Sequence, residues 1–273
     1  MIWGLKRVIK YALGTDIAGR NLAVYPDDTF IVSYPRSGNT WTRFLVANLI
    51  HPEQPATFAN IERLIPDCEA MSSRYVKRVP RPRIIKSHEY FDPRYPRVIY
   101  VVRDPRDVAV SFYHYQLKRR KLPESCSLEQ FVTRFVAGEI FSFCGPWDDH
   151  VNSWRYLRRG RREFAMLRYE DLLKDTEREL AKAAAVLGVD GNPERLARAV
   201  ALSSADRMRE LEKVQSQSWV LTKGTRGDKS FVRRAGQGEW KEVLSPKSIA
   251  KIEGAWGALM TELGYEEAAV TRE

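Results

Sequence analysis

The sequence has little of what disulfide-linked and metal-binding proteins need. Its three cysteines, Cys68, Cys126 and Cys144, are scattered through 273 residues, whereas a disulfide framework uses an even and dense set of cysteines. No two of them form a CxxC pair, and the four histidines lack the spacing of zinc ligands. We therefore predict a reducing, cytoplasmic location and no bound metal.

Long hydrophobic runs are also missing, because no stretch of the sequence reaches the length of a membrane-spanning helix. Residues 1–20 form a basic N-terminal arm in which Lys6, Arg7 and Lys10 interrupt the apolar residues, so we predict neither a signal peptide nor a membrane span. The arm has the pattern of a short amphipathic helix. It either packs on its own domain or makes peripheral contact with a membrane surface or a substrate channel.

Acidic residues are too few to balance the basic ones. The chain has 45 Lys and Arg against 35 Asp and Glu, a formal charge of +10, which favours an anionic ligand or partner. Basic runs at 118–121 and 158–162 raise the alternative of a nucleic-acid-binding module. No recognised nucleic-acid motif accompanies these runs, so we predict no nucleic-acid partner.

Strand and helix patterns alternate along the chain. Short apolar runs at 29–33, 83–87, 97–102 and 164–168 predict buried strands, and helical patterns follow three of them. Strands that alternate with helices form parallel sheets covered on both faces. We predict a three-layer α/β fold with a central, roughly five-stranded parallel sheet flanked by helices. Since no repeat or linker interrupts the pattern, residues 1–273 are predicted to form a single domain.

The segment after the first predicted strand, Tyr34-Pro-Arg-Ser-Gly-Asn-Thr-Trp41, has the composition of an anion-binding loop. Gly38 permits a tight turn, and backbone N–H groups at the start of the following helix can point toward an oxyanion. Side chains add further donors, and the aromatic face of Trp41 suits stacking on a base. The side-chain donors are Arg36, Ser37, Asn39 and Thr40.

This loop resembles a P-loop, so we expect a P-loop-like fold. It lacks the GxxxxGK sequence, followed by Ser or Thr, that binds nucleoside triphosphates. That sequence would need a glycine at Ser33, and a lysine followed by Ser or Thr at Asn39 and Thr40. A metal-dependent, kinase-like phosphotransferase that uses the same loop is the alternative function.

Four segments resemble, in order, those of the cytosolic-type sulfotransferases, which use 3′-phosphoadenosine-5′-phosphosulfate (PAPS). Tyr34–Trp41 resembles the 5′-phosphosulfate loop YPKSGTTW, and Lys86–His88 resembles the family's catalytic turn of Lys, Thr or Ser, and His. Val98–Ser111 resembles its 3′-phosphate segment, and Phe231–Lys241 resembles its C-terminal FxRKGxxGDWK element. The resemblance implies a PAPS-dependent sulfotransferase that transfers a sulfuryl group to a hydroxyl or amine of a small-molecule acceptor. The other product is 3′-phosphoadenosine-5′-phosphate (PAP).

The resemblance implies three catalytic residues. His88 is the general base, a role suited to an imidazole because it titrates near neutral pH. Lys86 neutralises charge on the transferring sulfuryl group or the bridging oxygen. Arg36 replaces the family's usual lysine and keeps its charge, although its planar head holds a phosphate differently. No metal is implied, since these positive side chains stabilise the transition state.

The resemblance also implies a cofactor site built from several parts of the chain. Arg103 and Ser111 would bind the 3′-phosphate, together with Arg233 and Arg234 from a loop at 216–240 that covers the cofactor. The expected cofactor-binding residues are Arg36, Ser37, Gly38, Asn39, Thr40, Trp41, Arg103, Ser111, Tyr169, Ser203, Phe231, Arg233, Arg234 and Ala235.

Several of these residues have simpler interpretations. Arg103 could form an ion pair with Asp104 or Asp107, Arg233 and Arg234 could be a solvated charge pair, and Tyr169 could be a core tyrosine. Ala205 replaces an aromatic residue that flanks the adenine in the family, and Arg234-Ala235 replaces a Lys-Gly pair. The family's C-terminal dimer pattern is not matched, so the sequence predicts no oligomeric state.

The acceptor pocket is predicted from the segments that diverge most from familiar relatives. His150, Trp147 and Phe91 are expected to line it, with contributions from residues 61–75 and 216–229. His150 could equally be a packing residue. Residues 141–150 are a further expected part of the pocket. Aromatic residues, among them Phe58, Phe141 and Phe143, indicate an apolar or aromatic acceptor.

Overall fold

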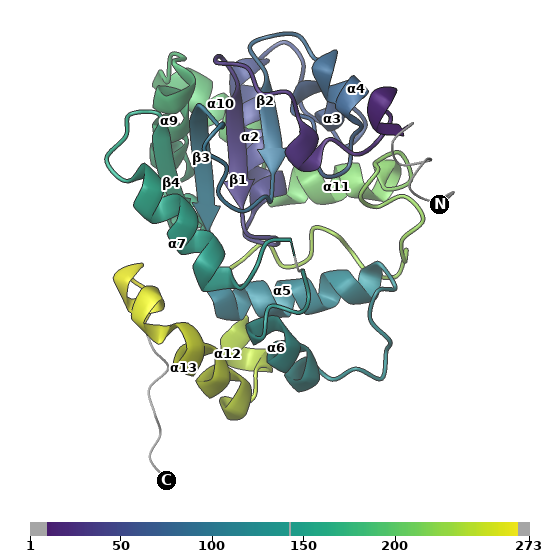
Figure 1. Cartoon of the computed structure of the whole chain (residues 1–273), viewed down its shortest axis with the longest axis vertical. Helices are drawn as coiled ribbons and strands as arrows, with labels where there is room; N and C mark the ends of the chain where they lie inside the picture. The colour runs from purple at the N-terminus through teal and green to yellow at the C-terminus, as the bar shows by residue number, and fades with distance from the viewer. Residues whose placement is uncertain (1–9, 142, 267–273) are drawn as a thin grey trace.

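The computed structural model describes residues 10–141 and 143–266, which form a parallel sheet with helices on both faces (Figure 1). The strand order is β2-β1-β3-β4, and every strand pair is parallel. The strands are β1 (Thr29–Ser33), β2 (Ile84–Ser87), β3 (Arg97–Val102) and β4 (Phe164–Arg168). The predicted three-layer α/β fold is confirmed, and each of the four strand ranges is correct to within one residue.

The prediction of roughly five strands is wrong, because the described residues contain four. The place beside β2 is taken by residues 66–68, which make one isolated parallel bridge between Asp67 and Lys86. Lys86 N–H donates to the Pro66 carbonyl (2.9 Å), and Cys68 N–H donates to the Lys86 carbonyl (3.1 Å). Pro66 has no N–H with which to extend this ladder, so the edge pairing stays too short to count as a strand.

The helices form two layers around the sheet. The first layer contains α5 (Pro105–Lys118), α6 (Leu128–Val136), α7 (Trp147–Arg158) and α13 (Pro246–Glu262). The second contains α2 (Asn39–Ile50), α3 (Ile61–Leu64), α9 (Thr176–Leu187), α10 (Pro193–Leu202) and α11 (Ala205–Gln215). Short helices elsewhere are η1 (Gly19–Asn21), α4 (Ser73–Lys77), α8 (Tyr169–Lys174) and α12 (Trp240–Val243).

Each face of the sheet buries its own set of apolar side chains. Along β3, Val98, Tyr100 and Val102 belong to the core under the first helix layer, whereas Ile99 and Val101 belong to the core under the second. This division follows from the alternation of side chains along a strand. It explains why the predicted strand is apolar throughout, as strands buried on both faces are.

Helix α5 crosses below the carboxyl ends of the strands (Figure 1). Its start is fixed by Asp104, whose side chain accepts a hydrogen bond from Arg106 N–H (2.9 Å), and by Pro105 in the first turn. Asp104 therefore caps the helix. Because α5 begins directly after β3, Arg103 and Ser111 are brought to the same edge of the sheet as the loop that follows β1.

Residues 216–239 contain no helix or strand. Side chains of α11 and α5 nevertheless hold this loop in place. Glu212 accepts hydrogen bonds from the backbone N–H groups of Phe231 (2.5 Å) and Val232 (2.8 Å). Asp107 accepts hydrogen bonds from those of Gly238 (2.6 Å) and Trp240 (3.1 Å). The loop predicted to cover a cofactor is thus held at its C-terminal end by α5 and α11.

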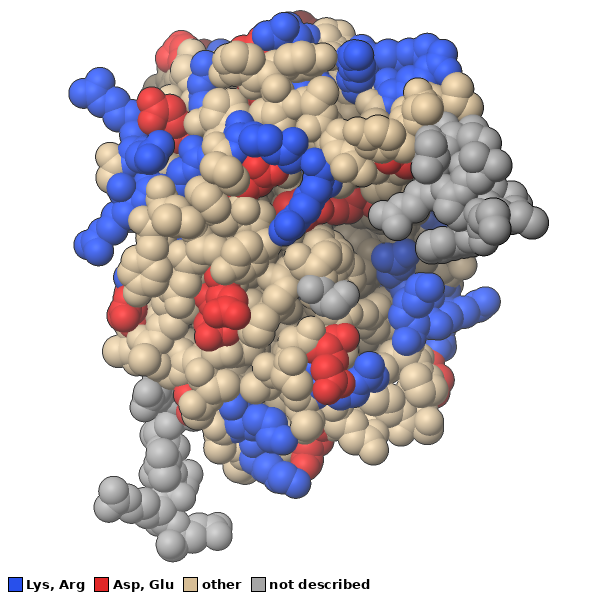
Figure 2. Space-filling view, in the orientation of Figure 1, with Lys and Arg blue, Asp and Glu red and all other residues tan. Residues whose placement is uncertain are grey.

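The N-terminal arm can be followed only in part, since residues 1–9 lie outside the described residues. Within residues 10–141 and 143–266, no helix is both long and apolar enough to cross a membrane. On the face seen in Figure 2, basic and acidic side chains are interspersed, and the basic ones do not form a single continuous stripe. This face gives no support to the alternative of a nucleic-acid-binding module.

Candidate active site

The anion-binding loop joins the end of β1 to α2 through a turn that only glycine can make. Gly38 has φ of 100°, and a Cβ at this position would lie 2.5 Å from Tyr169 Cδ2. The ring of Tyr169, at the start of α8, therefore packs directly on the loop. Helix α2 begins at the next residue, Asn39, so the free N–H groups of its first turn face the carboxyl edge of the sheet.

A cavity of about 310 Å³ opens beside this loop. Most of the sequence-predicted site residues line it, although they come from segments far apart in the chain. The predicted residues that line it are Arg36, Gly38, Asn39, Thr40, Trp41, Lys86, His88, Arg103, Ser111, Tyr169, Phe231, Arg233, Arg234 and Ala235. The five that do not are Ser37, Ser203, His150, Trp147 and Phe91.

Two arginines meet at one side of the cavity. Arg36 Nε donates to Ser111 Oγ (3.2 Å), and its guanidinium lies over the rings of Tyr115 (4.5 Å) and Phe231 (4.8 Å). Arg103 Nη1 donates to the Arg36 carbonyl (3.3 Å). Burial is the main cause that lowers the pKa of Arg36 to about 10, so the group stays charged at neutral pH. Among the described residues, no carboxylate balances this charge.

Buried donors without a protein partner point to a ligand at this place. Ser37 Oγ and Arg103 Nε are both buried and make no hydrogen bond within the part of the chain that the structure describes. A buried polar atom left in this state costs about 1–3 kcal/mol. Arg103 forms only a long ion pair with Asp107 (3.9 Å), so the alternative of a simple surface ion pair does not describe it. The donors therefore fit a bound anion at the loop and at the start of α5.

His88 is held in one tautomer. Its Nδ1 lies 2.7 Å from the Ser33 carbonyl oxygen, which can only accept, so Nδ1 carries the proton and Nε2 has a free lone pair. His88 lines the cavity. Burial, followed by the nearby charge of Lys86, lowers the pKa of His88 well below its usual value. The ring is therefore neutral at pH 7 and is able to take a proton on Nε2.

Lys86 does not lie free in the cavity, because two carboxylates hold its ammonium group. Its Nζ is 2.6 Å from Glu69 Oε2 and 3.0 Å from Asp67 Oδ2. Burial alone would lower the pKa of Lys86, but Asp67 and Glu69 outweigh it and raise the pKa above the usual value. Burial also raises the pKa of Glu69 to about 7. Asp67 and Glu69 line the cavity and were missed as site residues, although they fall in the predicted acceptor segment 61–75.

An aromatic corner closes the cavity opposite the catalytic turn. The ring of Tyr169 lies edge-on to Trp41 (5.7 Å between centroids), and the Arg103 guanidinium lies 4.4 Å from its centroid. Trp41 Nε1 donates to the Ser203 carbonyl (3.0 Å). Ser203 is itself fully buried, and its hydroxyl donates to the Ala199 carbonyl (2.8 Å). Ser203 therefore supports Trp41 and does not reach the cavity, which differs from its predicted position.

The C-terminal arginines reach the cavity with acidic partners of their own. Arg233 pairs with Glu239, and Arg234 pairs with Glu242 (2.7 Å). Ala235, at φ of 51°, occupies a backbone region that favours glycine, which is the residue expected there from the resemblance. Both arginines thus line the cavity while each is paired with a carboxylate, which differs from the alternative of a solvated charge pair.

The predicted acceptor residues need correction. Trp147 is fully buried 5.5 Å from Trp256, and Phe91 packs against Trp154 (5.1 Å), so both belong to the core under α7. His150 is also fully buried: Tyr100 Oη lies 2.9 Å from its Nδ1. Trp147 and His150 lie on the buried face of α7, where they contact Trp256 of α13 and Tyr100 of β3, and Phe91 lies in the loop after β2. The aromatic residues that line the cavity are Phe112, Tyr115, Phe141 and Phe143, in addition to Trp41, Tyr169 and Phe231.

His150 supports the catalytic turn from behind. Its Nε2 lies 3.2 Å from the His88 carbonyl and 3.1 Å from the Glu89 carbonyl. Burial lowers the pKa of His150 to about 4, so the ring is neutral when folded. This is the packing role that the sequence left open, and it places His150 behind His88, outside the cavity.

The fold and the loop together define a P-loop-like transferase with a site for an anionic nucleotide at the carboxyl edge of the sheet. The comparisons with known proteins identify the family. The family model described as "Sulfotransferase domain" matches residues 26–264. The chain therefore belongs to the sulfotransferase family.

Individual relatives agree with this assignment. The chain is 32% identical over 231 residues to Sulfotransferase 2B1 of Mus musculus, covering 80% of this chain and 67% of that protein. It is 27% identical over 244 residues to Sulfotransferase 1B1 of Canis lupus familiaris, covering 84% and 81%. The crystal structure of mouse sulfotransferase SULT7A1 complexed with PAP superposes with a TM-score of 0.71 at 25% identity, covering 90% of this chain and 89% of that chain. The predicted PAPS-dependent sulfotransferase activity is confirmed, and the kinase-like alternative finds no support.

Proposed function

We propose that this chain transfers the sulfuryl group of PAPS to a hydroxyl or amine of a small-molecule acceptor, with His88 as the general base. The observation that carries the proposal is the state of His88, whose Nδ1 is bound to the Ser33 carbonyl at 2.7 Å while the ring lines the same cavity as Arg36 and Lys86. A base, a cation and an anion-binding loop that share one cavity are the groups that sulfuryl transfer needs.

The cofactor site follows from the donors that line the cavity. The 5′-phosphosulfate would bind at the loop 34–41, where Ser37 Oγ has no partner, and the 3′-phosphate would bind at Arg103 and Ser111. Arg233 and Arg234 would close over it from the C-terminal loop. Trp41 and Tyr169 offer aromatic faces to the adenine.

The proposed reaction is an in-line displacement at sulfur. The acceptor oxygen forms a new O–S bond while the S–O bond to the 5′-phosphate breaks, and PAP leaves with that oxygen. The acceptor proton moves to His88 Nε2. Lys86 and Arg36 balance the charge that builds on the sulfuryl and bridging oxygens, which removes the need for a metal.

The acceptor is proposed to be an apolar or aromatic small molecule. Phe112, Phe141, Phe143 and Leu221 line the cavity, and apolar walls of this kind bind a ring or an alkyl group through burial of its surface. The reactive hydroxyl or amine would then point toward His88.

Three further predictions belong to this proposal. Residues 1–273 act as one domain, in which the loop at 216–240 covers the bound cofactor. The protein works in the cytoplasm, as its sparse cysteines suggest. The basic N-terminal arm, 1–20, guides the acceptor or contacts a membrane surface.

Isothermal titration tests the cofactor assignment directly. The purified protein is titrated with PAP, with adenosine-5′-phosphate, and with Mg-ATP. We expect PAP to bind without metal and at least about tenfold more tightly than adenosine-5′-phosphate, because each charged hydrogen bond to the 3′-phosphate is worth about 1.5–3 kcal/mol. A preference for Mg-ATP, or equal binding of PAP and adenosine-5′-phosphate, would refute the proposal.

A further inference from the structure

One carboxylate contacts three consecutive residues of the catalytic turn. Glu69 Oε1 accepts hydrogen bonds from His88 N–H (2.6 Å) and from the Ser87 hydroxyl (3.0 Å). Glu69 Oε2 accepts one from Lys86 Nζ (2.6 Å). The resemblance that identifies Lys86 and His88 assigns no role to Glu69.

The edge pairing beside β2 explains how Glu69 reaches this position. Asp67 is bridged to Lys86, and residues 68–70 form a turn directly after it. In this turn Glu69 N–H donates to Asp67 Oδ1 (2.9 Å) and Met71 N–H donates to the Asp67 carbonyl (2.8 Å). The turn brings Glu69 to the wall of the cavity beside Asp67. The segment is anchored from behind, because Asp67 N–H donates to Glu62 Oε2 (2.8 Å) and Glu62 pairs with the fully buried Arg43 (3.0 Å). The carboxylate is therefore held in place before any ligand binds.

We propose that Glu69 is a positioning residue for the catalytic turn: it fixes the directions in which His88 Nε2 and the Lys86 ammonium face the bound sulfuryl donor. This inference rests on the function proposed above. Glu69 itself touches neither the sulfur nor the acceptor proton in this account.

His88 is fixed at two ends by different parts of the chain. Glu69 holds its backbone N–H, and the Ser33 carbonyl holds its ring through Nδ1. Because the backbone and the ring are both held, the orientation of the imidazole is fixed, and with it the direction of the Nε2 lone pair. Since a displacement of about 1 Å can cost about 100-fold in rate, fixing this atom has a direct effect on turnover.

Lys86 is oriented by the same carboxylate. An ammonium group has three N–H donors, and Glu69 and Asp67 take two of them. The remaining donor is available to an oxygen of the sulfuryl group, because Lys86 lines the cavity. Without Glu69, the long side chain would rotate about its single bonds and the third donor would lose its direction.

The test is the substitution Glu69→Gln, which keeps the side-chain volume. The amide offers one acceptor oxygen, so it cannot serve the Lys86 ammonium and the Ser87–His88 pair together. We expect kcat to fall about 10–100-fold, with the KM of the acceptor and the Kd of PAP changed by less than about threefold. Transfer of ³⁵S from labelled PAPS to 2-naphthol, to a primary alkylamine and to water is measured. A kcat within about twofold of the wild type would overturn the inference.

Two further variants separate positioning from charge. Glu69→Asp keeps the charge but withdraws the carboxylate by about 1.5 Å, so we expect a loss close to that of Glu69→Gln. Asp67→Asn removes a partner of Lys86 that contacts neither Ser87 nor the His88 N–H, so we expect a smaller loss. Two outcomes would contradict the positioning role: full activity in Glu69→Asp, or a loss in Asp67→Asn equal to that in Glu69→Gln. Either would mean that Glu69 acts only through its negative charge.

The wild-type protein is measured first, so that two kinds of failure can be told apart. If it transfers no label to any of the three acceptors, the proposed function is wrong and the inference about Glu69 falls with it. If it binds PAP and transfers label while Glu69→Gln does so equally well, the function stands and only the inference fails. PAP titration of each variant checks that it has folded.

Discussion

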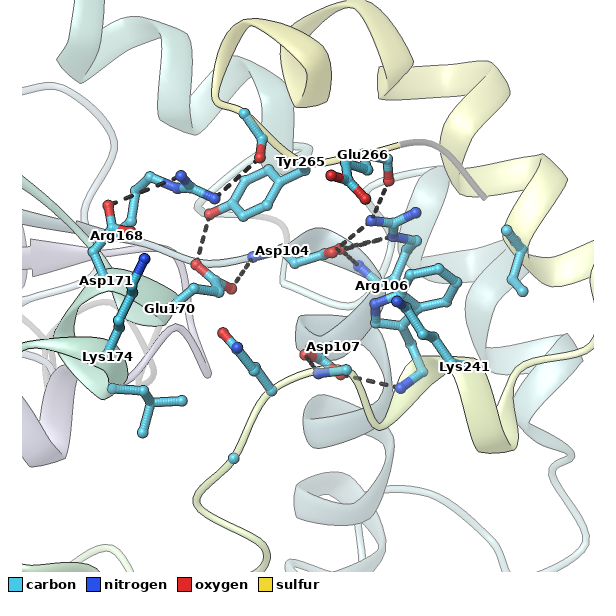
Figure 3. Close-up of a pocket in the computed structure, with 17 residues that line it drawn as sticks. Asp104, Arg106, Asp107, Arg168, Glu170, Asp171, Lys174, Lys241, Tyr265 and Glu266 are labelled. Atoms are coloured by element: carbon cyan, nitrogen blue, oxygen red, sulfur yellow. Dashed lines mark hydrogen bonds and ion pairs between the residues drawn. The ribbon is translucent and has the colours of Figure 1, made fainter. Parts of the chain in front are cut away.

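Two clefts of this protein share Leu173 and Gly236 in their walls, and they differ in how their charges are balanced. The larger, of about 1220 Å³, lies among α8, α12, α13 and the start of α5 (Figure 3). The smaller, of about 310 Å³, is the candidate active site. Volume alone would direct attention to the larger cleft.

Several charges of the larger cleft pair with one another, although Arg168 Nε in its wall is buried without a hydrogen-bond partner among the described residues. Figure 3 shows Arg106 bonded to Asp104 and Glu170 bonded to the Tyr265 hydroxyl, at 2.7 and 3.1 Å. The Asp107 carboxylate accepts hydrogen bonds from the backbone N–H groups of Gly238 and Trp240. The smaller cleft is lined by Arg103, whose Nε is buried without a hydrogen-bond partner among the described residues. The smaller cleft differs in that it also holds the buried guanidinium of Arg36, for which no described carboxylate provides a partner. A buried positive charge beside a free donor marks a place for an anionic ligand.

Removing His88, the proposed general base in the smaller cleft, should have the largest effect on turnover. We expect His88→Ala to lower turnover about 10²–10⁴-fold, the usual contribution of a general base, while PAP affinity changes little. Steady-state transfer of labelled sulfuryl and calorimetric PAP titration measure the two quantities. Turnover close to that of the wild type would remove His88 from the mechanism and weaken the contrast between the clefts.

Breaking a charge pair of the larger cleft should reduce stability and leave binding intact. Arg106 is buried, pairs with Asp104 and stacks 3.7 Å from the Trp240 ring centroid. Because Asp104 would keep a buried charge without this partner, we expect Arg106→Met to lower the free energy of unfolding by about 3–5 kcal/mol. Denaturant unfolding measures it. A loss of PAP affinity without a loss of stability would reverse the roles given to the two clefts.

Lowering the pH should reduce the stability of the folded chain through His150, the residue that lies behind the smaller cleft. The pKa of His150 is about 4 in the folded chain and about 6.5 when unfolded. Between these values the unfolded chain binds a proton that the folded chain does not, so stability is complete above pH 6.5 and declines as the pH falls toward 4. The decline amounts to about 3 kcal/mol. Denaturant unfolding at several pH values should show a smaller decline in His150→Gln than in the wild type.

Removing one cation from each cleft compares the contributions of the two clefts to nucleotide affinity. We expect Arg103→Ala to weaken PAP binding about 10–100-fold, since it removes charged hydrogen bonds to the 3′-phosphate. Its effect on adenosine-5′-phosphate should be small. Lys174→Ala, which removes a cation from the larger cleft, is the matched control and should leave both affinities within about twofold. Equal losses in the two variants would mean that net charge, and not a specific site, holds the nucleotide.

The parts of the fold that the sequence predicted are those decided by local chemistry. A run such as Thr29–Ser33, apolar and β-branched, has no alternative to a buried strand. Asp104 followed by Pro105 specifies a helix start from two adjacent residues. The anion-binding loop was found for the same reason, because Gly38 and its neighbouring donors act within one turn of chain.

The parts that were missed depend on contacts between distant residues. Glu69 reaches the catalytic turn only because residues 66–68 pair with the edge of β2. No local sequence pattern predicts a bridge of one residue. Trp147 was placed in the pocket because it is aromatic and lies in a segment that diverges from familiar relatives. Its actual position depends on packing against Trp256, more than a hundred residues later. Packing of this kind is decided by the assembled layers.

The hydrogen bond between His88 Nδ1 and the Ser33 carbonyl also bears on how acidic a productive acceptor must be. A neutral imidazole buried beside Lys86 holds an added proton weakly, as its lowered pKa states. A weak base draws a proton most readily from a group that gives it up easily. Phenolic hydroxyls, which are far more acidic than those of alkyl alcohols, should therefore be the faster acceptors among molecules of similar shape. In a series of substituted phenols, the rate should rise as electron-withdrawing groups lower the phenol pKa, until the phenolate becomes too poor a nucleophile.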